Sequence, residues 1–416
     1  MTAQRSLETD VLVIGGGPGG ATAAAHLARR GHRVIVVERD LLPRPEGFGV
    51  LLTPRSLAAL QQLELRDLES FHRVRHVRLT CDERSTSTTW PSHPHYPPYA
   101  AVASRHAFDR SVMHAAVAEG ATLLAGHEAT DPIVERGFAR GANVTAPDGT
   151  TFEARATYTI VADGANSRFG RALGTYRKPT WPYAVAQRAM YRSPLHDASE
   201  VELMLDLRDR AGTPITGYGW MLPAGDGTVT VGVMMMSTSP SFRVVNPTHL
   251  LEQVIADHGP RWHLGPEPTS TGSGGRIPLG LSVGPSAGPT YLLVGDAVGA
   301  ANPLSGAGIE SALETGSIAA EVVDEALQSG SAAALQQYTR RLAEWYGPFY
   351  KVGRLSNRVL GQPPMSPRIS RLVAKRKLAA DAFVRLATNE LRPGRAGVAE
   401  LVYRIGRTAS LIAPEA

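Results

Sequence analysis

The sequence predicts an α/β fold in which a parallel-sheet domain is joined to an inserted antiparallel sheet and to C-terminal helices. Three observations predict it: a strand–glycine–helix–strand succession near the N-terminus, strand-like segments separated by turn residues in the middle of the chain, and apolar residues at helical spacing near its end. The length of 416 residues favours two lobes, because a single core stops growing well below that size.

The succession near the N-terminus has the features of a Rossmann-type unit. Residues 11–14 form a short apolar run typical of a buried strand, and residues 21–30 are rich in alanine and predict a helix. Residues 33–38 predict a second strand. The glycines between the first strand and the helix have the G-x-G-x-x-G spacing, and they are Gly15, Gly17 and Gly20.

Each residue of this motif has a physical reason to be there. Gly15 permits the tight turn out of the strand, Gly17 lets the backbone approach a pyrophosphate, and Gly20 permits close packing of helix on strand. The helix N-terminus then offers unpaired N–H groups to the phosphates. Glu38, at the end of the second strand, can bind a ribose diol and disfavours a 2′-phosphate. The motif therefore predicts FAD or NAD and leaves the two open.

Two later strands also end at an aspartate. One leads to Asp163, and the other leads to Asp296. Gly306 and Gly308 then precede a long predicted helix, whose N-terminus can face an anionic or electron-rich group. An aspartate beside such a helix suits the hydroxyl groups of a ribityl chain, which favours FAD.

Together the three segments resemble the fingerprints of the flavoprotein hydroxylase superfamily, which uses FAD. Arg105 and Asp109 fit that superfamily's R-x-x-F-D pattern, whose arginine usually lies near the flavin. The resemblance therefore implies FAD as the cofactor.

A closer resemblance is to the geranylgeranyl reductase family. The family's E-R, F-P-R and L-T-P-R motifs resemble Glu38-Arg39, residues 42–44 and residues 52–55. Its Y-x-W-x-F-P motif resembles residues 218–223, and its G-D-A…P…G-x-G-I segment resembles residues 295–309. The C-terminal helices look like those of the actinobacterial branch, which includes menaquinone reductases.

This resemblance implies an FAD-dependent oxidoreductase that reduces a C=C bond in an isoprenoid or another hydrophobic polyene. The cofactor-binding residues that motif and resemblance together indicate are Gly15, Gly17, Gly20, Glu38, Arg39, Arg105, Asp163, Gly164, Asp296, Pro303, Gly306 and Gly308.

The sequence departs from the family at one place. The family usually has K-x-C-G-D-G before L-T-P-R, whereas here the cysteine is replaced by Phe48 and the aspartate by Val50. A thiol and a carboxylate could help to deliver a proton to a double bond, and phenylalanine and valine cannot. The two replacements therefore argue against the usual reaction of the family, and they do not affect the prediction of FAD as the cofactor.

The substrate is expected between the antiparallel sheet and the flavin, because ligands favour domain interfaces. The expected pocket residues are Phe48, Tyr218, Trp220 and Met234. Trp220 is the strongest candidate, because a large flat ring can hold a polyene or an aromatic group. Residues 234–236 are three methionines that also suit a buried core, and alternation lets only one of their faces reach a pocket.

The expected organisation is discontinuous. Residues 1–75, 102–175 and 276–345 form the FAD-binding domain, residues 76–101 and 176–275 form the substrate-binding sheet domain, and residues 346–416 form a C-terminal helical segment. The piece at 265–275, rich in glycine, serine and threonine, is expected to be a loop that returns to the FAD-binding domain.

The positive charge of the chain is concentrated in the C-terminal segment. From residue 351 onward there are thirteen Lys or Arg and four Asp or Glu, a balance of +9 against +5 for the whole chain. Such a segment can contact anionic lipid, and it can equally be a helical lobe packed on the rest of the protein with its basic residues outward. Nucleic-acid binding is not expected, because no binding module is present.

Other sequence features concern location and metal. Cys81 is the single cysteine, and no apolar run is long enough for a signal peptide or a membrane span, so we expect a cytoplasmic protein that can be peripheral at the inner membrane face. No zinc-ligand spacing is present and no metal is expected. No catalytic residue can be named from the sequence.

Three functions stay open. The first is reduction of an isoprenoid or polyene double bond, and the second is an FAD-dependent monooxygenase that hydroxylates or epoxidises an apolar substrate. The third is a flavin-holding protein with a non-redox cyclisation or carrier role. A second nucleotide fingerprint is missing, so electrons are expected from NADPH that binds transiently, from a flavin reductase or from a ferredoxin.

Overall fold

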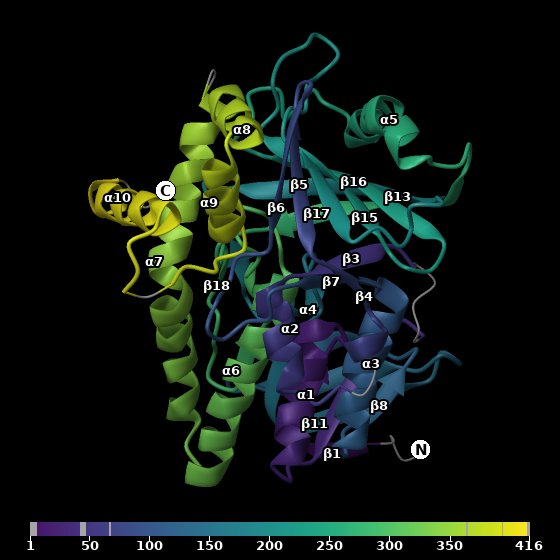
Figure 1. The fold of residues 1–416 in the computed structure, drawn as a ribbon. Helices are drawn as coiled ribbons and strands as arrows, with labels where there is room; N and C mark the ends of the chain where they lie inside the picture. Colours follow the sequence, from purple (N-terminus) through teal and green to yellow (C-terminus); the bar gives the residue numbers. More distant parts are fainter. Residues whose placement is uncertain (1–5, 42–46, 66–67, 363–364, 393, 414–416) are drawn as a thin grey trace.

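Two large sheets lie one above the other, and long helices run along one side of both (Figure 1). The computed structural model describes residues 6–41, 47–65, 68–362, 365–392 and 394–413. The motif at residues 42–44 and the residues up to 46 lie outside the described part of the chain.

The lower sheet is the Rossmann-type sheet. Its parallel strands pair in the order β8-β2-β1-β11, with β19 beside the end of β11, and an antiparallel hairpin extends it. The strands are β1 (Ser6–Ile14), β2 (Val34–Glu38), β8 (Thr122–Ala125), β9 (Glu128–Glu135), β10 (Phe138–Thr145), β11 (Thr151–Val161) and β19 (Tyr291–Leu293). Val11, Leu12 and Val13 are fully buried, because both faces of the sheet are covered, and this explains the unbroken apolar run.

Three helices pack side by side against this sheet. Helix α1 packs between α3 and α6, and Figure 1 shows the three side by side below the upper sheet. Their bounds are α1 (Pro18–Arg29), α3 (Arg105–Ala118) and α6 (Ile309–Ser329). The long helix expected after Gly308 is therefore present as α6.

The upper sheet is antiparallel except at one pair. Its order is β17-β13-β16-β15-β14-β5-β6, and only β14 and β5 run parallel. The strands are β5 (His76–Cys81), β6 (Arg84–Thr89), β13 (Tyr183–Arg192), β14 (Glu200–Met204), β15 (Gly217–Pro223), β16 (Thr228–Met236) and β17 (Pro268–Pro278). A small sheet of β3 (Gly49–Leu52), β7 (Ala100–Ser104) and β4 (His72–Val74) connects the two large ones.

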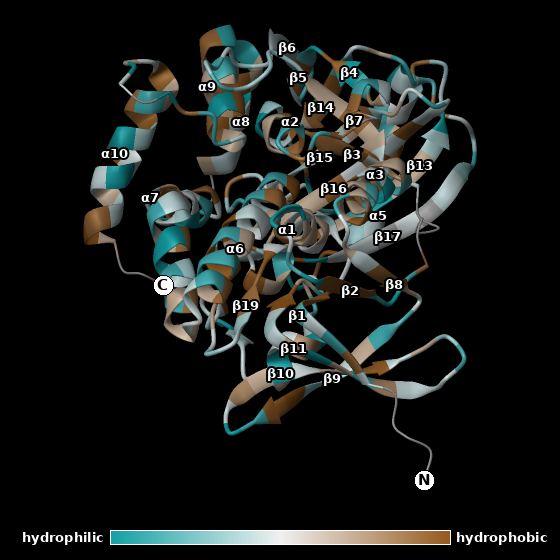
Figure 2. Cartoon of the chain, turned by 90° about the horizontal axis from the view of Figure 1, so that it is seen from below, coloured by the Kyte–Doolittle hydropathy of each residue, from teal (hydrophilic) through white to brown (hydrophobic). Residues whose placement is uncertain are grey.

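The two faces of the upper sheet have different partners. Met235 belongs to a core beneath α5 (Pro247–His258), whereas Met234 and Met236 pack in a cluster with Leu279 and Ala301. The three methionines at residues 234–236 are therefore buried on both faces of the sheet, and alternation directs Met234 toward the lower sheet. Figure 2 shows the hydrophobic strands of both sheets in the interior.

One expectation from the sequence is wrong. Residues 268–278 are not a loop but the edge strand β17, which pairs with β13. A side chain at Gly272 or Gly274 would meet the amide of Gln187 at 2.3 and 1.8 Å, so the glycines make room for this side chain of β13. The glycine-rich composition by itself indicates a loop. The reason for these glycines is the Gln187 side chain on the partner strand, which the composition of this segment does not reveal.

The C-terminal segment is helical and packs on the rest of the protein. It consists of α7 (Gln336–Leu360), α8 (Met365–Lys375), α9 (Lys377–Ala387) and α10 (Val398–Ile412). Val373 of α8 and Val384 of α9 are buried against the upper sheet, in one cluster with Leu79 and Trp90. Within the described ranges, no helix has the length and apolar character that crossing a bilayer requires.

The end of α9 and the turn after it are hydrogen-bonded to residues near the lower sheet. Arg55 donates to the carbonyl of Asn389 at 3.2 Å, and Asn302 donates to the carbonyl of Ala387 at 3.1 Å. Glu390 follows in this turn and is completely buried, and neither of its carboxylate oxygens has a hydrogen-bond partner among the described residues. Burial raises the pKa of Glu390 from 4.5 to about 8.

This buried acid predicts a pH-dependent stability. Because the pKa is raised in the folded state, the stabilisation is fully present below pH 4.5 and is lost as the pH rises through about 8. We expect Glu390→Gln to remove this slope, so that the variant gains on the order of 3 kcal/mol relative to the wild type between pH 5 and pH 9. Thermal unfolding at a series of pH values measures it. Glu344→Gln, at an exposed position, is the control, and equal slopes in wild type and Glu390→Gln would contradict the prediction.

Candidate functional site

A cavity of about 820 Å³ lies at the carboxyl ends of β1, β2 and β11 and extends to residues of β3, β13 and β17. In doubly wound sheets, ligands bind at this edge. The residues expected from the sequence that line it are Gly15, Gly17, Glu38, Arg39, Phe48, Arg105, Asp163, Gly164, Asp296, Gly306 and Gly308. Gly20, Pro303, Tyr218, Trp220 and Met234 do not line it.

The glycines of the first turn differ in what surrounds them. Gly15 has φ +104°, and a Cβ there would lie 2.4 Å from the carbonyl oxygen of Ala162. A Cβ on Gly20 would lie 2.0 Å from the carbonyl oxygen of Gly15. A Cβ on Gly17 would meet no atom within 4 Å, because this residue faces the cavity. Two glycines thus permit the packing, and the third leaves space for a ligand.

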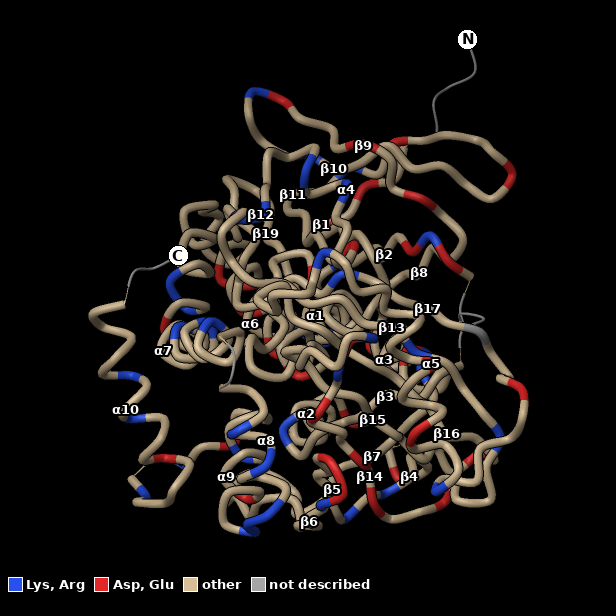
Figure 3. The backbone as a smooth tube through the Cα atoms, turned by 90° about the horizontal axis from the view of Figure 1, so that it is seen from above, with Lys and Arg blue, Asp and Glu red and all other residues tan. Residues whose placement is uncertain are grey.

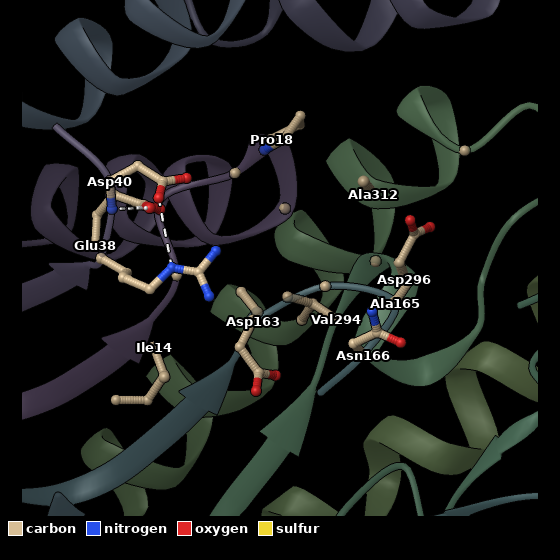
Figure 4. Close-up of a pocket in the computed structure, with 18 of the residues that line it drawn as sticks. Ile14, Pro18, Glu38, Asp40, Asp163, Ala165, Asn166, Val294, Asp296 and Ala312 are labelled. Carbon is tan, nitrogen blue, oxygen red and sulfur yellow. Dashed lines mark hydrogen bonds and ion pairs between the residues drawn. The ribbon is translucent and has the colours of Figure 1, made fainter. Parts of the chain in front are cut away.

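Glu38 organises one end of the cavity. Its carboxylate accepts hydrogen bonds from the backbone N–H of Gly16 at 2.7 Å and of Asp40 at 2.8 Å, and the residue is 4% exposed. The side chain of Arg39 is exposed and pairs with Asp40 at 3.4 Å. Figure 4 shows Glu38 and Asp40 at one end and Asp296 at the other, with Asp163 between them.

Asp163 follows β11 in the middle of the cavity. One carboxylate oxygen accepts the N–H of Phe169 at 3.0 Å, and the other is buried with no hydrogen-bond partner among the described residues. Burial raises the pKa of Asp163 above its usual value. Gly164 has φ +80° and turns the chain along the cavity wall. An acceptor oxygen that receives no hydrogen bond from the described part of the chain suits a ligand with hydroxyl groups.

Asp296 and the N-terminus of α6 form the opposite end. Asp296 lies in the short helix after β19, and burial raises its pKa to about 6, against the lowering effect of Arg105. Gly308 caps α6 without a side-chain hydrogen bond, and a Cβ there would lie 3.3 Å from Oδ1 of Asp296. The open N–H groups of this helix therefore lie beside the aspartate and the cavity.

Arg105 is held in place by its own helix. Its Nε donates to Asp109 at 2.8 Å, one helical turn later, and the Asp109 side chain is completely buried. The backbone N–H of Arg105 also donates to the carbonyl of Phe48 at 2.8 Å. The R-x-x-F-D pattern thus corresponds to an arginine oriented at the cavity by a buried carboxylate.

The wall next to the upper sheet is apolar with one cation. Phe48 and Val50 line the cavity and are each 7% exposed. The guanidinium of Arg188, from β13, lies 3.7 Å from the centre of the Phe48 ring. The sequence reasoning missed Arg188 and Ile277. The signal for Arg188 was alternation, because it shares a face of β13 with the buried Ala184 and Ala186.

The other three expected pocket residues, Tyr218, Trp220 and Met234, lie on the face of the upper sheet that is turned toward the lower sheet. Tyr218 donates its hydroxyl to the carbonyl of Ser305 at 2.6 Å, and burial raises the pKa of this phenol above its usual range. The indole of Trp220 lies over Gly232, where a Cβ would be 2.1 Å from the ring. Met234 lies against Gly306, with its sulfur 2.3 Å from the position of a Cβ. These side chains join the sheet to the segment before α6.

Pro303 lies behind that segment. It packs against Gly353 of α7, and its carbonyl accepts a hydrogen bond from the side chain of Asn357. Pro303 therefore supports the cavity wall from outside.

Comparison with known proteins identifies the family. A family model described as an FAD binding domain matches residues 8–216. The chain is 33% identical to the menaquinone reductase of Mycobacterium tuberculosis over 383 residues, which cover 91% of each chain. It is 30% identical to a digeranylgeranylglycerophospholipid reductase of Methanospirillum hungatei over 348 residues, which cover 80% of each. The chain belongs to the geranylgeranyl reductase family. It is an FAD-dependent oxidoreductase of the flavoprotein hydroxylase superfamily.

Solved structures share the fold of this geranylgeranyl reductase family member. A geranylgeranyl bacteriochlorophyll reductase-like protein from Thermoplasma acidophilum superposes with a TM-score of 0.76 at 22% identity, over 94% of this chain and 98% of the other. The flavin-dependent brominase Bmp2 superposes with a TM-score of 0.72 at 18% identity, over 97% and 98%. At these identities the comparison shows the fold alone.

FAD is the cofactor of this family member, and the cavity fits it. The open space at Gly17 accommodates a pyrophosphate. The buried oxygen of Asp163, which has no partner within the described ranges, provides an acceptor for a hydroxyl group. The acid at Glu38 lies at one end and the second helix N-terminus at the other, as a long dinucleotide requires.

A group with metal-ligand atoms lies elsewhere. Among the described residues, the ligand atoms of Cys81, Asp82 and Asp206 lie within 4.8 Å of one another. Asp82 is paired with Arg371 at 2.9 Å and Arg208 at 3.4 Å, and burial together with the two aspartates raises the pKa of the Cys81 thiol to about 11. A protonated thiol and a paired carboxylate are poor metal ligands, so this cluster is explained by its ion pairs.

The open space at Gly17 predicts a variant that folds and binds FAD poorly. We expect Gly17→Ala to weaken FAD binding at least about tenfold, because the new methyl group occupies space next to the backbone N–H groups. Titration of the FAD-free protein with FAD, followed by flavin fluorescence, measures the dissociation constant.

Gly347→Ala is the matched control for this variant. A Cβ at Gly347, on α7, also meets no atom within 4 Å, and this residue does not line the cavity. Unchanged FAD affinity in Gly17→Ala would contradict the prediction that the turn at Gly17 binds the pyrophosphate of FAD.

Proposed function

We propose that this protein uses FAD to reduce a C=C bond in the prenyl chain of a membrane lipid, with a prenylated quinone as the first candidate. The observation that carries this proposal is the 33% identity with a menaquinone reductase over 91% of both chains. The relatives named digeranylgeranylglycerophospholipid reductase support the same chemical class.

The division of labour follows from the cavity. Glu38, Gly17 and the N-terminus of α1 would hold the adenosine and pyrophosphate part of FAD, and Asp163, Asp296 and the N-terminus of α6 would hold the ribityl and ring part. When bound and reduced, FAD would supply a hydride for the double bond, and a proton would complete the reduction. Phe48, Val50 and Ile277 keep water from the wall beside the upper sheet.

One observation favours a second candidate, an FAD-dependent monooxygenase. Phe48 and Val50 line the cavity at the positions where the family usually carries a cysteine and an aspartate. Without that thiol and carboxylate, the cavity wall offers no acid of its own at this place, whereas an apolar wall suits oxygen transfer to an apolar substrate.

We propose that electrons reach FAD from outside the chain, from NADPH, a flavin reductase or a ferredoxin. We also propose that the protein works in the cytoplasm at the inner face of the membrane, where a prenylated lipid is available.

The products of two parallel reactions, one without and one with air, distinguish the candidate functions. We expect purified protein with bound FAD, reduced by dithionite and mixed with menaquinone in detergent, to add two hydrogen atoms to the prenyl chain. In D₂O, mass spectrometry of the product should find two deuterium atoms in that chain, because the hydrogen on the reduced flavin exchanges with solvent before transfer and the proton also comes from solvent. The same reaction without protein is the control.

Two other outcomes are informative. Gain of one oxygen atom, in a parallel reaction with NADPH and air, would replace the reductase by the monooxygenase. A product of unchanged composition would indicate the non-redox role. Either result would overturn the proposed function.

Trp220 provides a test of the substrate wall. We expect Trp220→Ala to raise KM for a prenylated substrate about tenfold, since the loss of one large apolar contact weakens binding by roughly that factor. FAD content should not change, because Trp220 does not line the cavity. Trp220→Phe retains a ring and should recover most of the affinity. An unchanged KM in Trp220→Ala would place the substrate elsewhere.

A further inference from the structure

Helix α10 has its apolar stripe on the outside of the protein. Val398, Leu401, Val402, Ile405 and Ile412 are 40, 56, 49, 63 and 89% exposed, and they recur at the three- and four-residue spacing of one helix face. An ordinary surface helix turns such a stripe toward the core. Figures 1 and 2 show α10 at the edge of the molecule, beyond α7 and away from both sheets.

The opposite side of α10 attaches the helix to the protein. Tyr403 stacks on Phe349 of α7, with ring centres 5.9 Å apart, and a Cβ on Gly406 would lie 2.9 Å from the side chain of Val352. Ala399 and Ser410 are buried on the same side. The helix is therefore docked through small and aromatic residues, whereas the side chains of its apolar stripe stay exposed.

The stripe is unusual within this chain. Of the 16 large hydrophobic side chains that are exposed in the described residues, six belong to α10. They include Leu411, which flanks the stripe at 73% exposure. A contiguous exposed apolar patch of this kind marks an interaction surface, in contrast to the scattered residues elsewhere.

The charges around the stripe indicate which kind of partner covers it. Arg395, Arg404 and Arg407 are exposed, and Glu400, the single acid of α10, is buried and paired with Arg392 at 3.0 Å. Figure 3 shows further Lys and Arg on the neighbouring helices α8 and α9. A second copy of the chain would bring these positive charges together, whereas an anionic lipid surface is complementary to them.

We propose that α10 lies along the surface of an anionic lipid bilayer, with its apolar stripe inserted between the headgroups and its arginines at the phosphates. An amphipathic helix with a basic polar face binds membranes in this way. This inference deepens the proposed function, on which its purpose rests: α10 contacts α9, and α9 packs against the same face of the upper sheet as Trp220. Helix α9 would thus lie between the bilayer that holds a prenylated substrate and the substrate wall.

Flotation with lipid vesicles tests this surface. We expect the full-length protein with bound FAD to float with vesicles of phosphatidylglycerol and phosphatidylcholine, and not with phosphatidylcholine alone. The double variant Leu401→Asp/Ile405→Asp should lower the bound fraction at least about tenfold, because charges replace the inserted side chains. Arg404→Gln and Arg407→Gln should each lower the partition constant about fivefold.

Matched controls separate this surface from general changes. Val134→Asp/Val244→Asp introduces the same charges at two exposed valines outside α10 and should float like the wild type. Bound FAD and the melting temperature show that each variant is folded. Equal flotation of the α10 variant and the wild type would refute the proposal, as would a dimer in solution that Leu401→Asp/Ile405→Asp dissociates.

The outcome does not depend on the reaction. If the wild type floats but reduces no prenylated substrate in detergent, the proposed function fails and the docking surface stands. If the double variant retains reduction in detergent and loses flotation, α10 serves the membrane and not the chemistry.

Discussion

The packing of the first turn of α1 against β11 is the constraint on which the site depends. The carbonyl oxygen of Ala162 lies where a side chain at residue 15 would be, and the carbonyl oxygen of Gly15 lies where one at residue 20 would be. Because the turn is this close, the helix N-terminus points into the cavity at Gly17. Glu38 then holds the turn through the N–H of Gly16, so the acid has a structural role besides any contact with a ribose.

The upper sheet completes the site by reaching down to the segment before α6. Tyr218 binds the carbonyl of Ser305, and Met234 fills the space above Gly306. Arg188 and Ile277 extend from the same sheet into the cavity lining. The cavity is therefore lined by residues of the upper sheet as well as by the ends of the lower strands.

The sequence predicted the elements whose cause is local. The glycine turn, the aspartates after β11 and β19, and the alternating strands of the upper sheet all follow from spacing and composition, and the fold class is confirmed. It failed at β17, where the glycines are explained by a side chain of β13. It also missed Arg188, whose neighbour Phe48 lies 140 positions earlier in the chain. The cofactor and family are confirmed, whereas the roles of individual site residues stay predictions.

The support behind Pro303 has a consequence for the order of assembly. Three hydrogen bonds hold the segment from residue 300 to residue 303. Tyr350 donates to the carbonyl of Ala300, Asn357 donates to the carbonyl of Pro303, and Asn302 donates to the carbonyl of Ala387 at the end of α9. All three contacts come from residues at least fifty positions later in the chain. During synthesis, the cavity wall before α6 therefore lacks these hydrogen bonds until α7 and α9 have left the ribosome. The cavity reaches its final shape only after that.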